Sequence, residues 1–357
     1  MMRKILAGIA GLMAGIVSVP GVPEAQIHRW GADYFPDAPV VTQDSKALHF
    51  YDDLIKDKIV VVNFIYTSCS RLCPIETARL AEVKDRLGDA VGRSIFFISM
   101  TVDPEHDTPD LLKAFADAFG AKAPGWQFVT GQPADIDAIN AKFGDRSAES
   151  GLSSHRNEIL IGNDATGDWE RDSSFNDVNQ LLMTIRLMDP NFRNKPGAIQ
   201  DQVAAGTGYY RLSDHPGQAM FQKLCAPCHT IGGGVRVGPD LRGVADRRAR
   251  SWLVDFIMDP AKVLARKDPD ALALAARFPS VHMPLMGIGE TDAADLIAYL
   301  RDQTSRLSTG TQGGAAPKQG VQAARPAGVS KGDMHLDAMN HDAMHPNGTH
   351  PAGNPNP

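Results

Sequence analysis

Cysteine is scarce in this chain of 357 residues, and the few that occur fall in two tight pairs. The pairs are Cys69 with Cys73 and Cys225 with Cys228. A secreted scaffold held together by disulfides normally spreads its cysteines along the chain. Both pairs therefore indicate metal or redox chemistry rather than structural cross-linking.

The sequence also lacks a long basic run and an apolar run long enough to span a membrane as a helix. The chain has no long basic run and a net charge of −6, which argues against a nucleic-acid binder.

The apolar run from Ile5 to Val19 is shorter than the ~20 residues that a membrane-spanning helix needs. It follows Arg3 and Lys4, which is the layout of a secretory signal. We therefore expect residues 1–25 to be an export signal or a retained N-terminal membrane anchor, and the protein to be periplasmic.

Strand-like and helix-like segments alternate between residues 26 and 190. The patterns predict strands at 58–67, 94–102, 126–130, 156–162 and 168–172, and helices at 74–87, 134–143 and 175–188, with a further helix starting after Asp107. Alternation of this kind is typical of a layered α/β domain.

The second half of the chain is organised differently. Residues 191–210 lose periodicity and gain proline, glycine and asparagine, which indicates a linker. Residues 211–307 contain only helical patterns, at 217–225, 250–258, 269–277 and 291–302, and predict a small all-α domain. Residues 308–357 are too poor in apolar side chains to fold, so we expect a disordered tail.

The all-α region contains the most specific motif, Cys225-Ala-Pro-Cys228-His229. This is the c-type haem attachment pattern, in which two thiols bond the vinyl groups and the imidazole binds iron. The surrounding segments resemble those of class I cytochromes c. The resemblance implies a covalent haem c on Cys225 and Cys228, with iron bound by His229 and with the carbonyl of Pro239 supporting that histidine.

The same resemblance implies a methionine as the second axial ligand of the iron. Met283, which is followed by proline, fits this role best. Met286 and His282 compete with it, and His282 as ligand would give a haem of lower potential.

The first cysteine pair, Cys69 and Cys73, follows an apolar strand and precedes a helix that starts near Pro74. Cysteines four apart there share a face near the positive end of the helix dipole, which favours thiolates. A structural disulfide, a thiol–disulfide reductant and a copper site all remain open. Two thiolates prefer Cu(I), and an added imidazole would hold either oxidation state. The residues alone leave His49, His106 and His155 as candidates for this third, imidazole ligand.

Three motifs in order resemble the Sco/SenC family: Tyr66-Thr-Ser-Cys69-Ser-Arg-Leu-Cys73-Pro74, Ser99-Met-Thr-Val-Asp103-Pro-Glu-His-Asp107, and Trp126-Gln-Phe-Val-Thr-Gly131. The resemblance covers roughly residues 38–188 and implies a thioredoxin-like fold that takes part in copper delivery to cytochrome c oxidase. It implies Cys69, Cys73 and His155 as ligands of Cu(I) or Cu(II). It also implies that the carboxylate of Asp103 lies next to these ligands without binding the metal itself. The family often has aspartate before that histidine, where this chain has Ser154.

The tail adds thioether and imidazole groups, which together could form a weak, exchangeable copper array or could reflect biased composition alone. They are Met334, His335, Met339, His341, Met344 and His345.

A haem exchanges one electron, whereas reduction of a disulfide needs two. Dithiol couples lie between about −120 and −270 mV, so a high-potential haem would reduce a disulfide only against a steep gradient. We therefore predict a copper-binding and delivery protein for cytochrome c oxidase assembly, with a haem-bearing domain for one-electron transfer. Its expected partner is an oxidase subunit or another copper or redox target. The alternatives are a thiol–disulfide oxidoreductase acting on a copper-site target and a tethered electron-carrier cytochrome.

Overall fold

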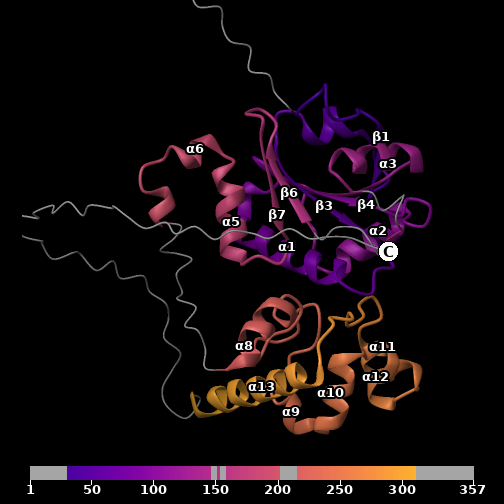
Figure 1. The fold of residues 1–357 in the computed structure, drawn as a ribbon, viewed down its shortest axis with the longest axis vertical. Coiled ribbons are helices and arrows are strands. Elements are labelled where there is room, and N and C mark those ends of the chain that lie inside the picture. The colour runs from indigo at the N-terminus through magenta and orange to yellow at the C-terminus, as the bar shows by residue number, and fades with distance from the viewer. Residues whose placement is uncertain (1–29, 146–150, 153–157, 202–214, 311–357) are drawn as a thin grey trace, which may run out of the picture. The chain divides into compact units, whose positions relative to one another are not determined.

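The computed structural model of the chain describes residues 30–145, 151–152, 158–201 and 215–310. It contains a sheet-based domain followed along the chain by an all-helical domain (Figure 1), so the predicted α/β and all-α regions are both confirmed. The export signal, His155 with Ser154, and the Met/His tail lie outside the described residues. Within those residues no helix is long and apolar enough to cross a membrane.

Seven strands form one mixed sheet in the order β2-β1-β5-β4-β3-β6-β7. They are β1 (Pro39–Thr42), β2 (Ala47–His49), β3 (Ile59–Ile65), β4 (Ile95–Thr101), β5 (Trp126–Thr130), β6 (Glu158–Asn163) and β7 (Asp168–Ser173). Strand β4 runs parallel to β3 and β5, whereas β6 and β1 pair antiparallel with the central group. The sequence did not predict β1 and β2, which are short and close one edge of the sheet.

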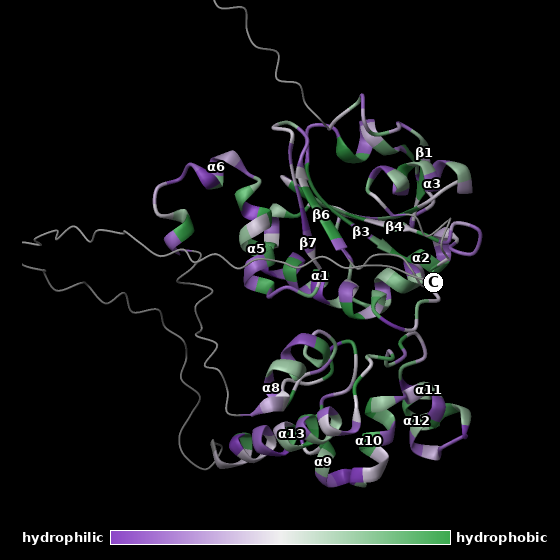
Figure 2. Ribbon diagram, in the orientation of Figure 1, coloured by the Kyte–Doolittle hydropathy of each residue, from purple (hydrophilic) through white to green (hydrophobic). Residues whose placement is uncertain are grey.

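Helices cover both faces of this sheet (Figure 1). One face carries α1 (Cys73–Leu87), α2 (Pro109–Ala118) and α5 (Val178–Leu187), and the other carries the turn η1 (Phe50–Ile55) and α3 (Pro133–Lys142). Because side chains alternate along a strand, Ile59 and Val61 of β3 pack with the first set, and Val60 and Val62 with the second. Strand β3 is buried throughout, and the central strands are predominantly hydrophobic in Figure 2.

The topology brings two loops to one edge of the sheet. Because β3 and β4 are parallel, the loop after β3, which carries Cys69, and the loop after β4, which carries Asp103, leave at the same edge. Helix α1 begins at Cys73, one residue before the predicted start, with Pro74 in its first turn. It ends at Leu87 and is followed by the capping residue Gly88, whose φ of 58° suits glycine.

A short helix, α6 (Pro190–Arg193), follows α5, so the predicted linker begins with a helical turn rather than irregular chain. The helical domain contains α8 (Pro216–Met220), the turn η4 (Phe221–Cys225), α9 (Val244–Arg247), α10 (Arg250–Met258), α11 (Pro260–Ala265), α12 (Pro269–Arg277) and α13 (Glu290–Gly310). Helices α8 and α13 cross closely at Gly217, where a Cβ atom would lie 2.3 Å from the Asp295 carbonyl oxygen. This crossing fixes the segment that leads into the second cysteine pair.

Candidate functional site

The first cysteine pair is buried at the edge of the sheet. Cys69 is 7% exposed and Cys73, the first residue of α1, is fully buried. The two thiols are hydrogen-bonded to each other, so their sulfur atoms are neighbours, and no disulfide joins them. Two adjacent sulfur donors are suited either to a soft metal ion or to disulfide formation.

The electrostatics of the pair differ from the sequence-based expectation of thiolates. Burial raises the pKa of Cys73 well above its ordinary value, and the neighbouring Cys69 raises it further. Burial therefore disfavours the thiolate of Cys73, which is opposite to the direction expected from the helix start alone. A metal ion that binds there has to displace the proton.

A buried carboxylate, Asp107, anchors the loop that carries Cys69. Asp107 is 1% exposed and accepts hydrogen bonds from the Thr67 amide at 3.1 Å and the Thr67 hydroxyl at 2.5 Å. It also accepts one from the Thr101 hydroxyl at 2.5 Å. The sequence alone predicts Asp107 only as a residue at the start of a helix. Its position 40 residues from Thr67 hides this contact from any local pattern.

Asp103, predicted to lie behind the metal ligands, accepts a 2.7 Å hydrogen bond from Nδ1 of His106. The side chain of Asp103 is 12% exposed and that of His106 is 75% exposed. Asp103 raises the pKa of His106 through this bond and its charge. His49 is also exposed, beside Asp37. Among the described residues no three or more histidine, cysteine or acidic side chains gather as a metal site.

A buried polar chain runs beneath the cysteine helix. The Asn63 amide donates to Glu76 at 2.8 Å, the Ser99 hydroxyl donates to Asn63 at 2.7 Å, and the Trp126 indole donates to Ser99 at 2.9 Å. These bonds join α1, β3, β4 and β5, and all four residues are at most 1% exposed. Buried hydrogen-bonded groups of this kind hold neighbouring elements in one register. No local sequence pattern predicts this series of hydrogen bonds, because its members are distant from one another along the sequence.

The second cysteine pair lines an apolar pocket of the helical domain. The turn η4 ends at Cys225, and the His229 amide donates to the Cys225 carbonyl at 2.9 Å. The Pro239 carbonyl lies 2.8 Å from Nδ1 of His229. Because a carbonyl oxygen only accepts, Nδ1 carries the proton and Nε2 keeps a free lone pair. Burial lowers the pKa of His229, which favours this neutral form.

A glycine makes room for that histidine ring. A Cβ atom at Gly238 would lie 2.5 Å from Cε1 of His229 and 2.9 Å from Nδ1, closer than such atoms approach. The Gly238 amide donates to the Cys228 carbonyl at 2.8 Å, which ties the loop to the cysteine motif. Glycine therefore allows the ring and the loop to pack face to face.

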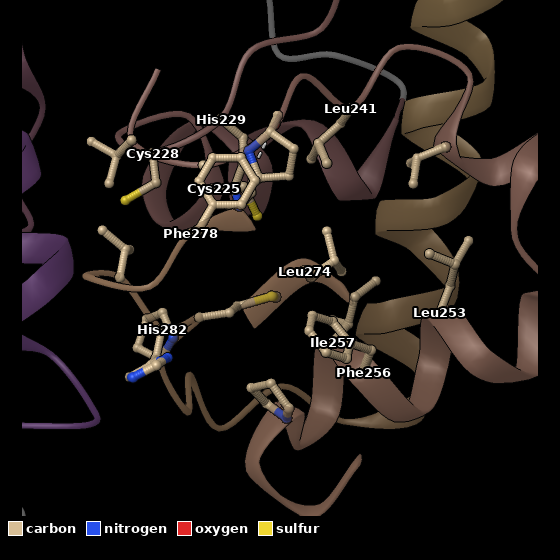
Figure 3. Close-up of a pocket in the computed structure, with 18 of the residues that line it drawn as sticks. Cys225, Cys228, His229, Leu241, Leu253, Phe256, Ile257, Leu274, Phe278 and His282 are labelled. Carbon is tan, nitrogen blue, oxygen red and sulfur yellow. Dashed lines mark hydrogen bonds between the residues drawn. The ribbon is translucent and has the colours of Figure 1, made fainter. Parts of the chain in front are cut away.

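Figure 3 shows Cys225, Cys228 and His229 close together in the pocket, with apolar side chains both beside them and across from them. The apolar residues labelled there are Leu241, Leu253, Phe256, Ile257, Leu274 and Phe278. Two thiols, a neutral imidazole with its Nε2 available, and apolar walls form a donor set that fits a covalently attached haem. Burial raises the pKa of each of the two thiols to about 12.

All three candidates for the second axial position line the same pocket: Met283, Met286 and His282. Met283 and Met286 are half-buried and pack against the core of the helical domain, whereas His282 is exposed. Met283 stays the prediction for the second axial ligand.

Comparison with known proteins assigns both domains. The SCO1/SenC family model matches residues 41–161, and the cytochrome c model matches residues 215–304. The SCO1 protein homolog of Bacillus subtilis is 34% identical over 89 residues, which are 25% of this chain and 45% of that protein. Cytochrome c of Theileria annulata is 33% identical over 100 residues, which are 25% of this chain and 85% of that protein.

Among solved structures, Bradyrhizobium japonicum ScoI with copper bound matches with 20% identity and a TM-score of 0.36, over 43% of this chain and 99% of that one. The chain spans less than half the length of the first SCO1 and SCO2-like relatives that it matches, between 34% and 45% of each. The predicted thioredoxin-like fold and both predicted family resemblances are confirmed. The protein thus carries a domain of the SCO1/SenC family followed by a domain of the cytochrome c family.

Proposed function

We propose that this protein binds copper through Cys69, Cys73 and His155 and delivers it to cytochrome c oxidase or another copper target. The C-terminal domain carries a c-type haem for one-electron transfer. The observation that carries the proposal is the hydrogen-bonded pair of buried thiols at the start of α1, within a SCO1/SenC domain.

Copper(I) suits this pair better than harder metal ions because thiolate sulfur is a soft ligand. The thiols are shielded from solvent, and the raised pKa of Cys73 means that copper binding releases protons. A histidine as third donor extends the site to Cu(II), so the domain can take up or release copper in either state.

In the helical domain, Cys225 and Cys228 would hold the haem covalently, with His229 and Met283 as axial ligands. When bound, the haem supplies a reversible one-electron couple. Pro239 holds the imidazole of His229 in the tautomer that binds iron, and the apolar walls exclude water. One-electron exchange matches the copper couple, whereas a disulfide would need two electrons.

The test uses the full chain, expressed with export and haem attachment, and measures copper per chain and the Cu(II) absorption spectrum. We expect about one tightly bound copper, carried by soft sulfur ligands. Cys69→Ser should abolish it, and His155→Ala should abolish Cu(II) binding. His106→Ala is the matched control, because that histidine is exposed and paired with Asp103, and it should bind copper as the unaltered protein does.

A second function, thiol–disulfide exchange on a copper-site target, is favoured by the same thiol pair, since hydrogen-bonded neighbouring sulfurs can form a disulfide. A reductase should stay active when His155 is replaced, whereas a three-ligand copper site should not. Haem without copper after loading would instead favour a tethered electron carrier. Rapid mixing of the haem-reduced protein with Cu(II) tests exchange between the domains, and absence of haem oxidation would refute that exchange.

The layout of residues 1–25 supports export to the periplasm, with retention of the segment as an anchor as the alternative. Protease accessibility in spheroplasts tests the location, and mass measurement of the purified chain tests cleavage. Deleting residues 308–357 tests the copper role of the tail, because only weak, additional copper equivalents should be lost.

A further inference from the structure

One residue, Tyr66, contacts both sulfur atoms of the first cysteine pair. Its phenol hydrogen-bonds Cys69, and its main-chain amide hydrogen-bonds Cys73. Its carbonyl accepts the Cys69 amide at 3.1 Å. In the sequence, Tyr66 is recognisable only as part of the motif that resembles the Sco/SenC family.

The surroundings of Tyr66 hold it in this position. The residue directly follows β3, and its ring packs against the hydrophobic clusters on both faces of the sheet. The next residue, Thr67, is bound to Asp107 by both its amide and its hydroxyl. With the chain fixed on both sides, the phenol has little freedom to leave Cys69, so the hydrogen bond is preorganised.

A hydrogen bond donated to a cysteine sulfur has a predictable chemical effect. It stabilises the electron-rich sulfur of the reduced or metal-bound state more than the sulfur of a disulfide, which is a poorer acceptor. In copper–thiolate sites, hydrogen bonding around the cysteine sulfur is one of the factors that set the reduction potential. An ordinary phenol, with a pKa of about 10, is protonated at neutral pH, so the hydroxyl of Tyr66 can act as the donor of this bond.

We propose that Tyr66 is a positioning residue whose phenol donates a hydrogen bond to Cys69 and thereby favours the reduced dithiol over the disulfide and sets the copper potential. The copper part rests on the proposed function. The dithiol part does not, because it concerns only the two cysteines.

The test variant is Tyr66→Phe in the full chain, which removes one hydroxyl and keeps the ring. The first readout is the equilibrium between the dithiol and the disulfide in buffers of reduced and oxidised dithiothreitol, measured by alkylation and mass spectrometry. Loss of one hydrogen bond should shift this equilibrium about fivefold toward the disulfide. The second readout is the sulfur-to-Cu(II) charge-transfer band, which should move to longer wavelength as the sulfur becomes more electron-rich.

Tyr51→Phe is the matched control, because it also removes a partly buried hydroxyl, one that donates to Asp164 at 3.1 Å. It should leave both readouts unchanged. If Tyr66→Phe leaves the dithiol equilibrium unchanged, or if the control shifts it equally, the proposal is overturned. If the unaltered chain binds no copper, the proposed function fails, and the dithiol equilibrium still decides the role of Tyr66.

Should Tyr66→Phe fail to fold, 3-fluorotyrosine at position 66 provides a second variant that keeps the hydroxyl. Its phenol is a stronger donor, so the equilibrium should move in the opposite direction, toward the dithiol. A shift toward the disulfide, or none, would overturn the proposal.

Discussion

Replacing Asp107 with alanine should release the loop that carries Cys69. The carboxylate of Asp107 accepts hydrogen bonds from three donors, namely the Thr67 amide, the Thr67 hydroxyl and the Thr101 hydroxyl. Because the site is 1% exposed, water cannot replace the acceptor, and each buried donor left unpaired costs about 1–3 kcal/mol. The hydroxyls can rotate toward other acceptors, but the amide cannot, so we expect a loss of about 3 kcal/mol in the free energy of unfolding.

A loss of this size should lower the melting temperature of the sheet domain by about 10 °C, since a domain of its size shifts about 2–4 °C per kcal/mol. Circular dichroism of the full chain measures this. Alkylation of Cys69, which is only 7% exposed, should also become faster. Asp117→Asn is the control, because that carboxylate forms only a surface ion pair with Lys122 and should change stability by less than about 1 kcal/mol. Equal melting temperatures and alkylation rates for Asp107→Ala and the unaltered protein would refute the anchoring role.

The pH dependence of Asp107 provides a separate check on its burial. Desolvation raises its pKa above the ordinary value of 3.8, despite the hydrogen bonds from Thr67 and Thr101. The folded state therefore holds the proton more tightly than the unfolded state. This contribution to stability is fully present below pH 3.8 and is lost as the pH rises through the folded-state pKa. The advantage in melting temperature of the unaltered protein over Asp107→Asn should accordingly increase as the pH is lowered toward 4.

Two further predictions concern the histidines. Gly238→Ala should displace the imidazole of His229, because the added Cβ would lie 2.5 Å from Cε1, and overpacking of this kind costs about 1–3 kcal/mol. Altered haem absorption and a lower melting temperature should appear in Gly238→Ala but not in Gly289→Ala, whose Cβ would meet nothing closer than 3.8 Å. Asp103→Asn should lower the pKa of His106 toward its ordinary value of 6.5, because the 2.7 Å bond and the charge of Asp103 raise it. NMR titration of His106 measures this, and an unchanged pKa would contradict the assignment.

The motifs that lie within a few residues of one another could be read from the sequence. Cys225, Cys228 and His229 are neighbours in the chain, so the haem attachment that they predict rests on their spacing alone. The contact between His229 and Pro239 spans ten residues, and its prediction rested on the family resemblance. The central strands and their helices were also predictable, because burial imposes periods of about 2 and 3.6 residues on the sequence.

The tertiary structure decided the features that depend on distant residues meeting. Asp107 reaches Thr67 because β3 and β4 are parallel and leave the sheet at one edge, which no local pattern records. The sequence by itself predicted a helix that starts beside Cys73, and the positive end of the helix dipole then suggested thiolates. Only the fold showed that Cys73 is fully buried, and the loss of hydration there raises the pKa of its thiol and disfavours the thiolate.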